Sequence, residues 1–330
     1  MSAATTAATP SPLVRRRSRR IPWSALSTAA IMVALGAADV IIQPNLLNLF
    51  QIGLLLQTAL PLVFVAAAQT LVVLVRGIDL SVGGVLVVAN GLTVVTVGGA
   101  GGDHQLLLIL VLVVGLAAGA LNGVLVGVLG LQPFIATLGT WTIFNGIALT
   151  VLPTDGGTPP PWLINFTLGA VGGVPNTLII LVGVVVVWRI LCATKLGIRI
   201  RAVGADEDRA SLNGTSVLAV KLIVYSLAGL CAALAGILLA GATSTGTPTA
   251  GDAYILTSVA AVVIGGTSLV GRGGGVGLTV MAAMALTFIS DIVNAENFSV
   301  WVSVAASSGL LLVVVVLRGV VEQVVERRHA

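Results

Sequence analysis

The stretch KLGIRIRAVGADEDRASLNGTSVLAVK, residues Lys195 to Lys221, carries eight charged side chains in a chain that is otherwise almost continuously apolar. Charged side chains are costly to remove from water. On both sides the sequence consists of long runs rich in leucine, valine, isoleucine and alanine. The stretch therefore separates two hydrophobic blocks and is expected to lie in water, where a soluble partner could bind it.

The composition of the whole chain excludes an ordinary soluble protein. Of its 330 residues 57% are hydrophobic and 8% are charged, whereas about a quarter of residues are charged in typical soluble domains. The apolar runs lack the period-two alternation of a membrane β-barrel, which favours helices that satisfy their own backbone hydrogen bonds. The 40 glycines suit helices that pack closely in lipid. The sequence thus predicts an all-α, polytopic membrane protein.

A bilayer is crossed by about 20 apolar residues, and on that measure the chain contains about ten transmembrane helices. The predicted spans lie near residues 22–42, 50–75, 80–98, 105–129, 132–152, 175–192, 217–241, 253–270, 276–294 and 299–317. Residues 1–20 are expected to form a disordered basic tail, residues 21–318 the membrane domain with a cytosolic loop at about 193–216, and residues 319–330 a second tail.

The positions of the charges support this division. If the spans alternate from a cytosolic start, all 16 lysines and arginines fall on the cytosolic side, including the run Arg15 to Arg20. The opposite side then carries acidic residues alone, at Asp39, Asp103, Asp155, Asp252, Asp291 and Glu296. Basic residues near span ends face the cytosol, so both termini are expected there. The net charge of +4 reflects this orientation, and no nucleic-acid partner is expected.

No residue pattern indicates chemistry within the chain. It contains no GxxxxGK[ST] phosphate-binding loop, and its two histidines, His104 and His329, lie in a predicted outer loop and in the tail. Cys192 and Cys231 lack metal-site spacing and are interpreted as small buried hydrophobic residues. Almost every charge lies near a predicted membrane interface, which disfavours an ion-coupled carrier. Neither an enzyme, a metal site nor an internal ATPase is predicted, so the energy source is expected outside the chain.

Polar residues inside the predicted spans are candidates for a translocation path. Each one could instead form hydrogen bonds between helices, which is the commoner role for a single polar residue in a membrane helix. As a group they are consistent with a neutral path for an uncharged, polyhydroxylated solute, and Trp141 could stack on a sugar face. They are Gln57, Gln69, Asn90, Asn122, Gln132, Thr137, Thr140, Trp141 and Asn145.

Two connecting segments have their own patterns. In RGIDLSVGG, Arg76 to Gly84, either Asp79 or Ser81 is expected to cap the next helix, and Gly83 and Gly84 permit close packing. Arg76 is interpreted as a residue that sets topology. The longest predicted outer loop, Pro153 to Asn176, suits a short interfacial helix or a docking rim, and a plain connector fits it equally well.

The string GIDLSVGG resembles the signature of inner-membrane permeases of bacterial ABC importers for monosaccharides, the family typified by the ribose importer permease. Its matching residues are Gly77, Asp79, Leu80, Ser81, Gly83 and Gly84. The resemblance extends in the same order through Leu121–Gly127, Leu131–Thr140, Arg201–Gly214 and Pro248–Val280.

This resemblance implies the ABC importer permease fold in the bacterial plasma (inner) membrane, surrounded by lipid. It further implies a dimeric pore made with a second copy or a homologue, separate ATPase subunits that use ATP and magnesium, and an extracytoplasmic sugar-binding protein. No cofactor is implied for the chain itself.

The resemblance also places an ATPase-coupling helix in the charged stretch. Its pattern is matched by Gly204, Ala210, Leu212 and Gly214, whereas Asp206, Arg209 and Thr215 replace the usual asparagine, alanine and isoleucine. Gly204 is expected to let the chain turn, Asp206 to cap a short helix with Glu207 and Asp208 in its first turn, and Ala210 to offer a small face to a partner groove. The alternative is a solvated loop whose charges only set topology.

The expected function is therefore that of a permease subunit that translocates a monosaccharide. Permeases of the same architecture for a nucleoside, a sugar-like autoinducer or a branched-chain amino acid remain alternatives. From other classes, a stand-alone channel, an ion-coupled carrier and a scaffolding subunit without a path also remain.

Overall fold

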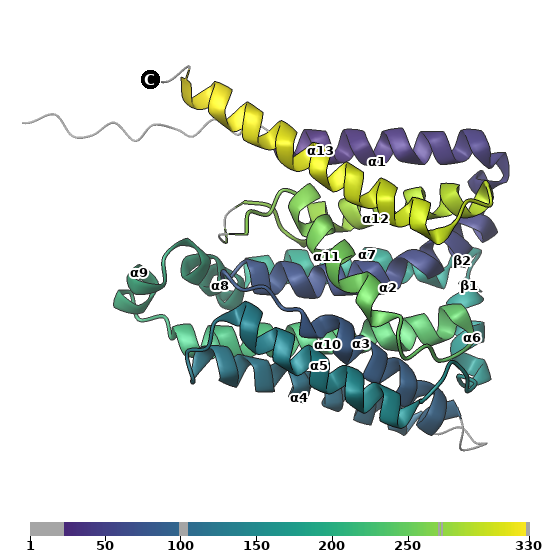
Figure 1. The fold of residues 1–330 in the computed structure, drawn as a ribbon, viewed down its shortest axis with the longest axis horizontal. Helices are drawn as coiled ribbons and strands as arrows, with labels where there is room; N and C mark the ends of the chain where they lie inside the picture. Colours follow the sequence, from purple (N-terminus) through teal and green to yellow (C-terminus); the bar gives the residue numbers. More distant parts are fainter. Residues whose placement is uncertain (1–22, 99–104, 270, 272, 328–330) are drawn as a thin grey trace, which may run out of the picture.

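The computed structural model describes residues 23–98, 105–269, 271 and 273–327. The predictions for residues 1–20, and those for Asp103, His104, Arg272, Arg328 and His329, fall outside these residues. The described chain consists of helices and one short β-hairpin, whose two strands have two residues each (Figure 1). This confirms the all-α prediction.

Eight helical segments within the described residues are long and apolar enough to cross a membrane. They are α1 (Trp23–Ile42), α2 (Leu49–Val73), α3 (Ser81–Leu92) with the π-helical η2 (Thr93–Gly98), α4 (Leu106–Gly127), α5 (Pro133–Val151), α7 (Asn176–Ala193), α10 (Val217–Thr243) and α12 (Val276–Ala295). The remaining elements are η1 (Pro44–Leu47), α6 (Pro161–Leu168), β1 (Ala170–Val171), β2 (Val174–Pro175), α8 (Lys195–Ala205), α9 (Glu207–Leu212), α11 (Gly251–Ile264) and α13 (Val300–Arg327).

Each of the ten predicted spans contains a helix, but their extents differ at two places. The predicted span 253–270 is a 14-residue helix, α11, which ends at Ile264. Gly265 and Gly266 follow it, and Gly266 has φ 85°, a conformation that suits glycine. At about 1.5 Å per residue such a helix is shorter than a bilayer core of roughly 30 Å. At the other end of the chain, α13 continues without a break through the predicted tail to Arg327.

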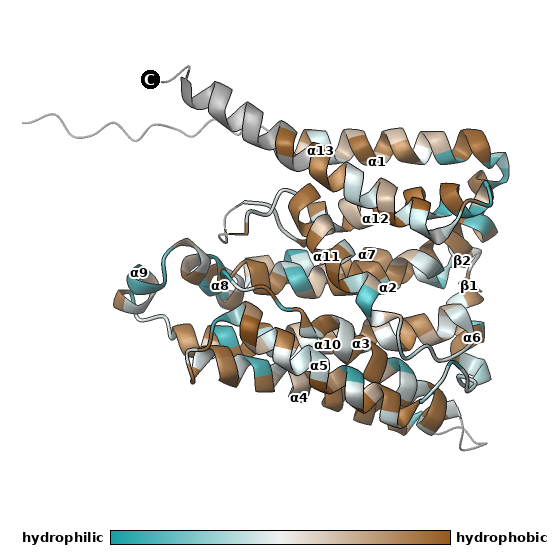
Figure 2. Ribbon diagram, viewed as in Figure 1, coloured by the Kyte–Doolittle hydropathy of each residue, from teal (hydrophilic) through white to brown (hydrophobic). Residues whose placement is uncertain are grey.

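The long helices lie side by side and alternate in direction (Figure 1). The start of α1, the end of α13, and α8 and α9 lie at one end of the molecule, whereas α6 and the hairpin lie at the other. Figure 2 shows hydrophobic residues along the long helices and hydrophilic ones on α8 and α9. The connectivity therefore has the alternation that the charge distribution predicts.

Helix α10 is central, because it packs on α4, α2 and α3. Four glycines of α4, spaced four residues apart, face α10 and allow the two backbones to approach. A Cβ atom at Gly119 would overlap the carbonyl oxygen of Tyr225, and one at Gly123 would lie 2.9 Å from the Cα of Leu222. Close backbone contact, rather than large side chains, thus holds this pair together.

The outer loop predicted between residues 153 and 176 contains the short helix α6 and the β1–β2 hairpin. The loop therefore contains the short helix that was expected, and its interfacial or docking role stays a prediction. The two cysteines are half-buried rather than buried, and Arg201 donates a hydrogen bond of 3.6 Å to the sulfur of Cys192.

Candidate functional site

Helices α8 and α9 are each started by a side chain of the expected kind. The hydroxyl of Thr194 accepts a 3.2 Å hydrogen bond from the backbone N–H of Gly197 at the start of α8. Asp206 caps α9, because its Oδ1 accepts a 3.0 Å hydrogen bond from the N–H of Arg209. That bond and the nearby Arg209 charge lower the pKa of Asp206. The predicted cap at Asp206 is thus present, and Glu207 and Asp208 occupy the first turn.

The end of α9 is set by Gly214, which has φ 76°. The N–H of Gly214 donates to the carbonyl of Ser211 at 2.9 Å and that of Thr215 to the carbonyl of Ala210 at 3.0 Å, as in a Schellman motif. The side chain of Leu212 projects from the last turn and is 87% exposed. Gly214 therefore terminates the helix, and Leu212 is the apolar group that α9 presents to solvent.

Ala210 is 5% exposed and packs against the hydrophobic core, and it also lines an open hollow beside α9, so its contact with a partner stays a prediction. One expectation for this segment is wrong. Gly204 does not turn the chain, since it lies within the last turn of α8. A Cβ atom at Gly204 would overlap the carbonyl oxygen of Leu74 and lie 3.1 Å from that of Gly271. Glycine is required there for close approach.

Two cationic side chains attach α8 and α9 to the membrane helices. Arg76, in the turn between α2 and α3, donates from Nε to the carbonyl of Gly204 at 2.8 Å and from Nη2 to the carbonyl of Ala205. Lys221 of α10 forms a 2.8 Å ion pair with Glu207 of α9. Sequence reasoning missed the role of Arg76 in this attachment, although its position directly before the signature was a signal.

The signature residues form a buried polar network. Oδ1 of Asp79 accepts hydrogen bonds from the N–H and the hydroxyl of Ser81, at 2.9 and 2.6 Å. Asn122 of α4 donates to the Ser81 hydroxyl at 2.6 Å, and the hydroxyl of Thr140 in α5 donates to the side-chain oxygen Oδ1 of Asn122 at 2.7 Å. The N-cap position of α3 is Leu80, without a side-chain capping bond, and Asp79 binds the N–H of the first helical residue, Ser81. Burial raises the pKa of the Asp79 carboxyl to about 6, and the two Ser81 bonds oppose this shift.

The glycines of the signature permit close contacts with three helices. A Cβ atom at Gly83 would lie 2.7 Å from the carbonyl oxygen of Gly251 in α11, and one at Gly84 would lie 2.8 Å from the Cβ of Phe144 in α5. At Gly77 it would overlap the hydroxyl of Tyr225 in α10. The N–H of Leu80 donates to the hydroxyl of Thr137 at 3.1 Å.

Most polar residues predicted for a path form hydrogen bonds between elements. Asn90 donates to the carbonyl of Gly236 at 3.3 Å and accepts from the N–H of Thr247 at 2.7 Å. Gln57 donates to the hydroxyl of Thr167 at 3.0 Å. Asn122, Thr137 and Thr140 belong to the contacts around the signature. Gln132 is exposed, at the start of α5 and outside the helix.

Three candidates differ from the rest. Gln69 of α2 is fully buried, and neither its amide nitrogen nor its amide oxygen has a hydrogen-bond partner within the described chain. The indole Nε1 of Trp141 is likewise buried without a partner there. Asn145, one turn further along α5, is half-buried and makes no side-chain hydrogen bond with a described residue. A buried unpaired polar group costs about 1–3 kcal/mol, so these groups have hydrogen-bonding capacity that the helix packing does not use.

Helix α5 also has an open side. Its buried residues, Ala136, Thr137, Thr140, Phe144 and Ala148, pack mainly against α3. On the other side a Cβ atom added at Gly139 or at Gly146 would meet nothing within 4 Å, and Ile143 is exposed. The side of α5 that carries Gly139, Ile143 and Gly146 is therefore free within the described chain, whereas Trp141 and Asn145 lie at the edge of the packed side.

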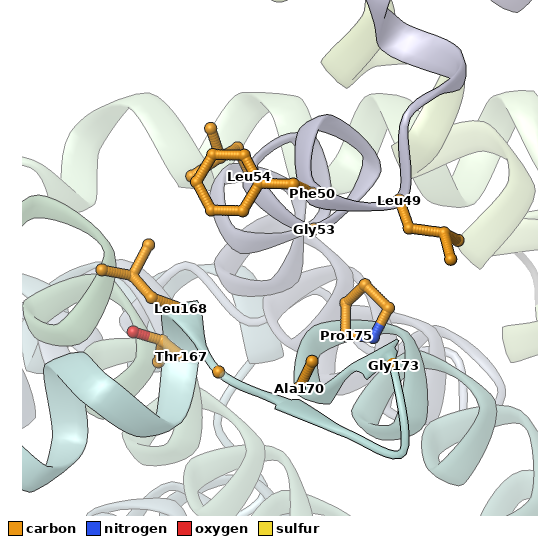
Figure 3. Close-up of a pocket in the computed structure, with 10 residues that line it drawn as sticks. Leu49, Phe50, Gly53, Leu54, Thr167, Leu168, Ala170, Gly173 and Pro175 are labelled. Carbon is orange, nitrogen blue, oxygen red and sulfur yellow. The ribbon is translucent and has the colours of Figure 1, made fainter.

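A cavity of about 160 Å³ lies at the end opposite α8 and α9, between the start of α2, α6 and the hairpin (Figure 3). Its lining is apolar apart from Thr167, whose hydroxyl already accepts from Gln57. Because it offers no unused side-chain hydrogen-bonding group, this cavity is a poor site for a polyhydroxylated solute.

Comparison with known proteins adds independent observations. A family model described as "Branched-chain amino acid transport system / permease component" matches residues 51–317. The chain is 35% identical to the ribose import permease protein of Bacillus subtilis over 84% of its length and 87% of the relative's. It is 35% identical to a fructose import permease protein of Bifidobacterium longum, covering 73% and 71% of the two chains. It is 31% identical to the D-allose transport system permease protein of Escherichia coli, covering 77% and 79%. No solved structure matches the chain.

Proposed function

The chain belongs to the branched-chain amino acid transport system permease component family, and from this premise we propose that it is the membrane-spanning subunit of an ABC importer for a monosaccharide. The observation that carries the proposal is the similarity to ribose, fructose and allose permeases over most of the chain. Residues 21–318 would form the membrane domain. Both termini would be cytosolic, in the plasma membrane of a bacterium.

The polar groups of the interior support an uncharged substrate. Gln69, Trp141 and Asn145 offer unused hydrogen-bonding groups and an aromatic face, and none of them is charged. The ionisable side chains in the described spanning helices, such as Asp39, Arg189 and Asp291, lie in the turns near helix ends. A sugar needs hydrogen bonds and stacking without a counter-charge, whereas an amino acid carries two charges that must be compensated. The absence of charge on these three candidate side chains therefore favours the sugar.

The translocation path would lie along the open side of α5, closed by a second copy of the chain or by a homologue. In the conformation described here the amide of Gln69 and the indole N–H of Trp141 are buried without partners among the described residues. Opening the path would expose these groups to water and then to sugar hydroxyls, which would recover the lost hydrogen bonds. The unpaired side chains thus favour an interpretation of this conformation as a closed state.

The segment α8–α9 would bind the ATPase subunit on the cytosolic side. Leu212 projects from α9 beside a hollow of about 550 Å³ lined by Ala202, Ala205, Asp206, Arg209, Ala210, Asn213 and Thr215. An exposed leucine next to a polar hollow suits a contact in which one apolar side chain enters a partner groove. The ATPase would supply the ATP and magnesium chemistry, and a sugar-binding protein would deliver the substrate at the opposite end.

Reconstitution tests the proposal. The chain, its ATPase and its binding protein are placed in proteoliposomes, and uptake of radiolabelled ribose, fructose, allose and leucine is measured with and without ATP. ATP-dependent uptake of one of the sugars, absent when the ATPase is omitted, is expected. Uptake by the chain alone would instead indicate a channel or carrier, and ATP-dependent uptake of leucine alone would favour the amino-acid alternative. No uptake of any solute by the complete assembly would favour a scaffolding subunit.

A further inference from the structure

We infer that Arg76 is the positioning residue that transmits movement of α8–α9 to α3, α4 and α5. This inference rests on the proposed function, because it concerns how ATP-driven movement reaches the path. It assigns to the turn between α2 and α3, residues 74–80, a role as a short mechanical connection. Its first half contacts the coupling segment, and its second half contacts the helices beside the path.

The first half of the turn is fastened to the end of α8. The last carbonyls of a helix have no partner within the helix and carry partial negative charge. Arg76 donates to two of them, those of Gly204 and Ala205. A planar guanidinium group that donates to two acceptors fixes the orientation of the acceptors relative to it as well as their distance. The end of α8 therefore cannot turn relative to α2 without breaking this contact.

Backbone packing at the same place leaves no free space between the turn and the end of α8. Gly204 lies against the carbonyl of Leu74 and near that of Gly271, so that even a methyl group would not fit. Gly271 in turn lies against the side chain of Arg76, since its Cβ would be 3.2 Å from the arginine Cγ. Arg76 adopts φ 63°, a strained conformation for a residue other than glycine. The surrounding contacts hold it there.

The second half of the turn is fastened to α4 and α5. Leu80 donates its N–H to Thr137 of α5, and the Thr137 hydroxyl lies 3.2 Å from the carbonyl of Ile78. Ser81 is linked through Asn122 to Thr140, which lies on α5 between Thr137 and Asn145. The side chains of Ser81, Asn122, Thr137 and Thr140 are buried, so the bonds are not exchanged readily for bonds to water.

The second attachment of α9, between Glu207 and Lys221, does not duplicate this connection. It leads to α10, and both side chains keep partial access to solvent, 35% for Glu207 and 18% for Lys221. Partly exposed ion pairs are screened by water and allow motion. Loss of Arg76 would therefore leave α9 attached to the protein while uncoupling it from α3 to α5.

The test uses the full importer in proteoliposomes with the variants Arg76→Ala and Arg76→Lys. Because a hydrogen bond to a charged group is among the stronger ones, Arg76→Ala is expected to lower sugar uptake and the stimulation of ATPase activity by the binding protein about tenfold or more. Basal ATPase activity and assembly with the ATPase should stay within about twofold. Arg76→Lys keeps the charge without the fork and should give an intermediate loss. Arg189→Ala, an exposed arginine at the end of α7, is the matched control and should behave as wild type.

A second readout separates transmission from mere stability. With spin labels at position 208 on α9 and position 139 on α5, both EPR spectra should change when ATP is added to the otherwise wild-type importer. In Arg76→Ala only the spectrum of the label on α9 should change. A response of both labels, or full stimulation in Arg76→Ala, would overturn the inference. If the Arg76→Ala variant does not assemble, the same label and stimulation measurements on Arg76→Lys test the inference. Failure of the wild-type importer to take up any sugar would instead refute the proposed function.

Discussion

Two glutamines on the same helix show how differently one residue type can be used. Gln57 and Gln69 both lie in α2 and both are buried. Gln57 donates to Thr167 and to the carbonyl of Gly241, and it thereby joins α2 to α6 and α10. Gln69 has no partner for either amide atom within the described residues. The first contributes to stability, whereas the second reduces it and has hydrogen-bonding groups that the packing does not use.

The two glutamines therefore predict opposite effects of the same substitution. Gln57→Leu removes one partner of a buried hydrogen-bonded group and should destabilise the protein by about 1–3 kcal/mol. Gln69→Leu removes an unpaired amide and should leave stability unchanged or raise it, while sugar uptake falls. Thermal midpoints in detergent and uptake in proteoliposomes are compared for the two variants. Destabilisation by Gln69→Leu with normal uptake would show that Gln69 has only a packing role.

Sequence reasoning distinguishes such residues poorly, because the partners of a side chain lie on other helices. The nine polar candidates could be identified from their place inside apolar runs, but their division into bonded and unbonded groups depends on tertiary contacts. The same limit applies to Gly204 and Ala210. Both are small, and small residues suit either a turn, a free surface or a tight contact. The fold selects the tight contact at Gly204, whereas Ala210 packs against the core and also lines the hollow beside α9.

At the scale of elements, the contact between α4 and α10 depends on glycine. Gly115, Gly119, Gly123 and Gly127 of α4 lie against α10, whereas a Cβ atom on Gly183 of α7 would meet nothing within 4 Å. Leucine at position 119 would force the two backbones apart, which costs about 1–3 kcal/mol or more. Leucine at position 183 would gain roughly 0.7 kcal/mol of helix propensity over glycine.

Gly119→Leu is thus expected to lower the thermal midpoint in detergent, and Gly183→Leu to leave it unchanged or raise it slightly. Both variants add the same side chain to a membrane helix, so lipid affinity does not differ between them. Equal midpoints for the two variants would contradict the assignment of the α4–α10 contact as a close backbone interface.

The helices themselves were largely predictable, because a run of about 20 apolar residues has few alternatives in a bilayer. Two helices differ from the prediction: α13 extends through the predicted tail, and α11 ends early. Residues 265–270, GGTSLV, are apolar enough to extend a predicted span, but two glycines at its start end the helix, and the chain then turns toward the end of α8. A hydropathy average over the segment does not reveal such a break, because the end of the helix depends on the backbone conformation of the two glycines.

At the scale of the whole molecule, charge and connectivity agree. The alternation predicted from basic residues places the start of α1, the end of α13 and the α8–α9 segment on one side, and the structure has them at one end (Figure 1). Which end faces the cytosol stays a prediction from the positive-inside rule. The pair Asp39 and Asp291, bridged by the amide of Gln43, lies at the opposite end.

Labelling of single cysteines tests this orientation. In a chain whose Cys192 and Cys231 are replaced by alanine, one cysteine is introduced by Ser211→Cys on α9 or by Thr154→Cys before α6, both at exposed positions. Because basic residues are retained on the cytosolic side, a membrane-impermeant maleimide should label the Thr154→Cys variant in intact cells and the Ser211→Cys variant only after permeabilisation. Normal uptake by both variants controls for misinsertion. Labelling of Ser211→Cys in intact cells would place α8–α9 outside, away from ATP, and would remove the basis for coupling at this segment.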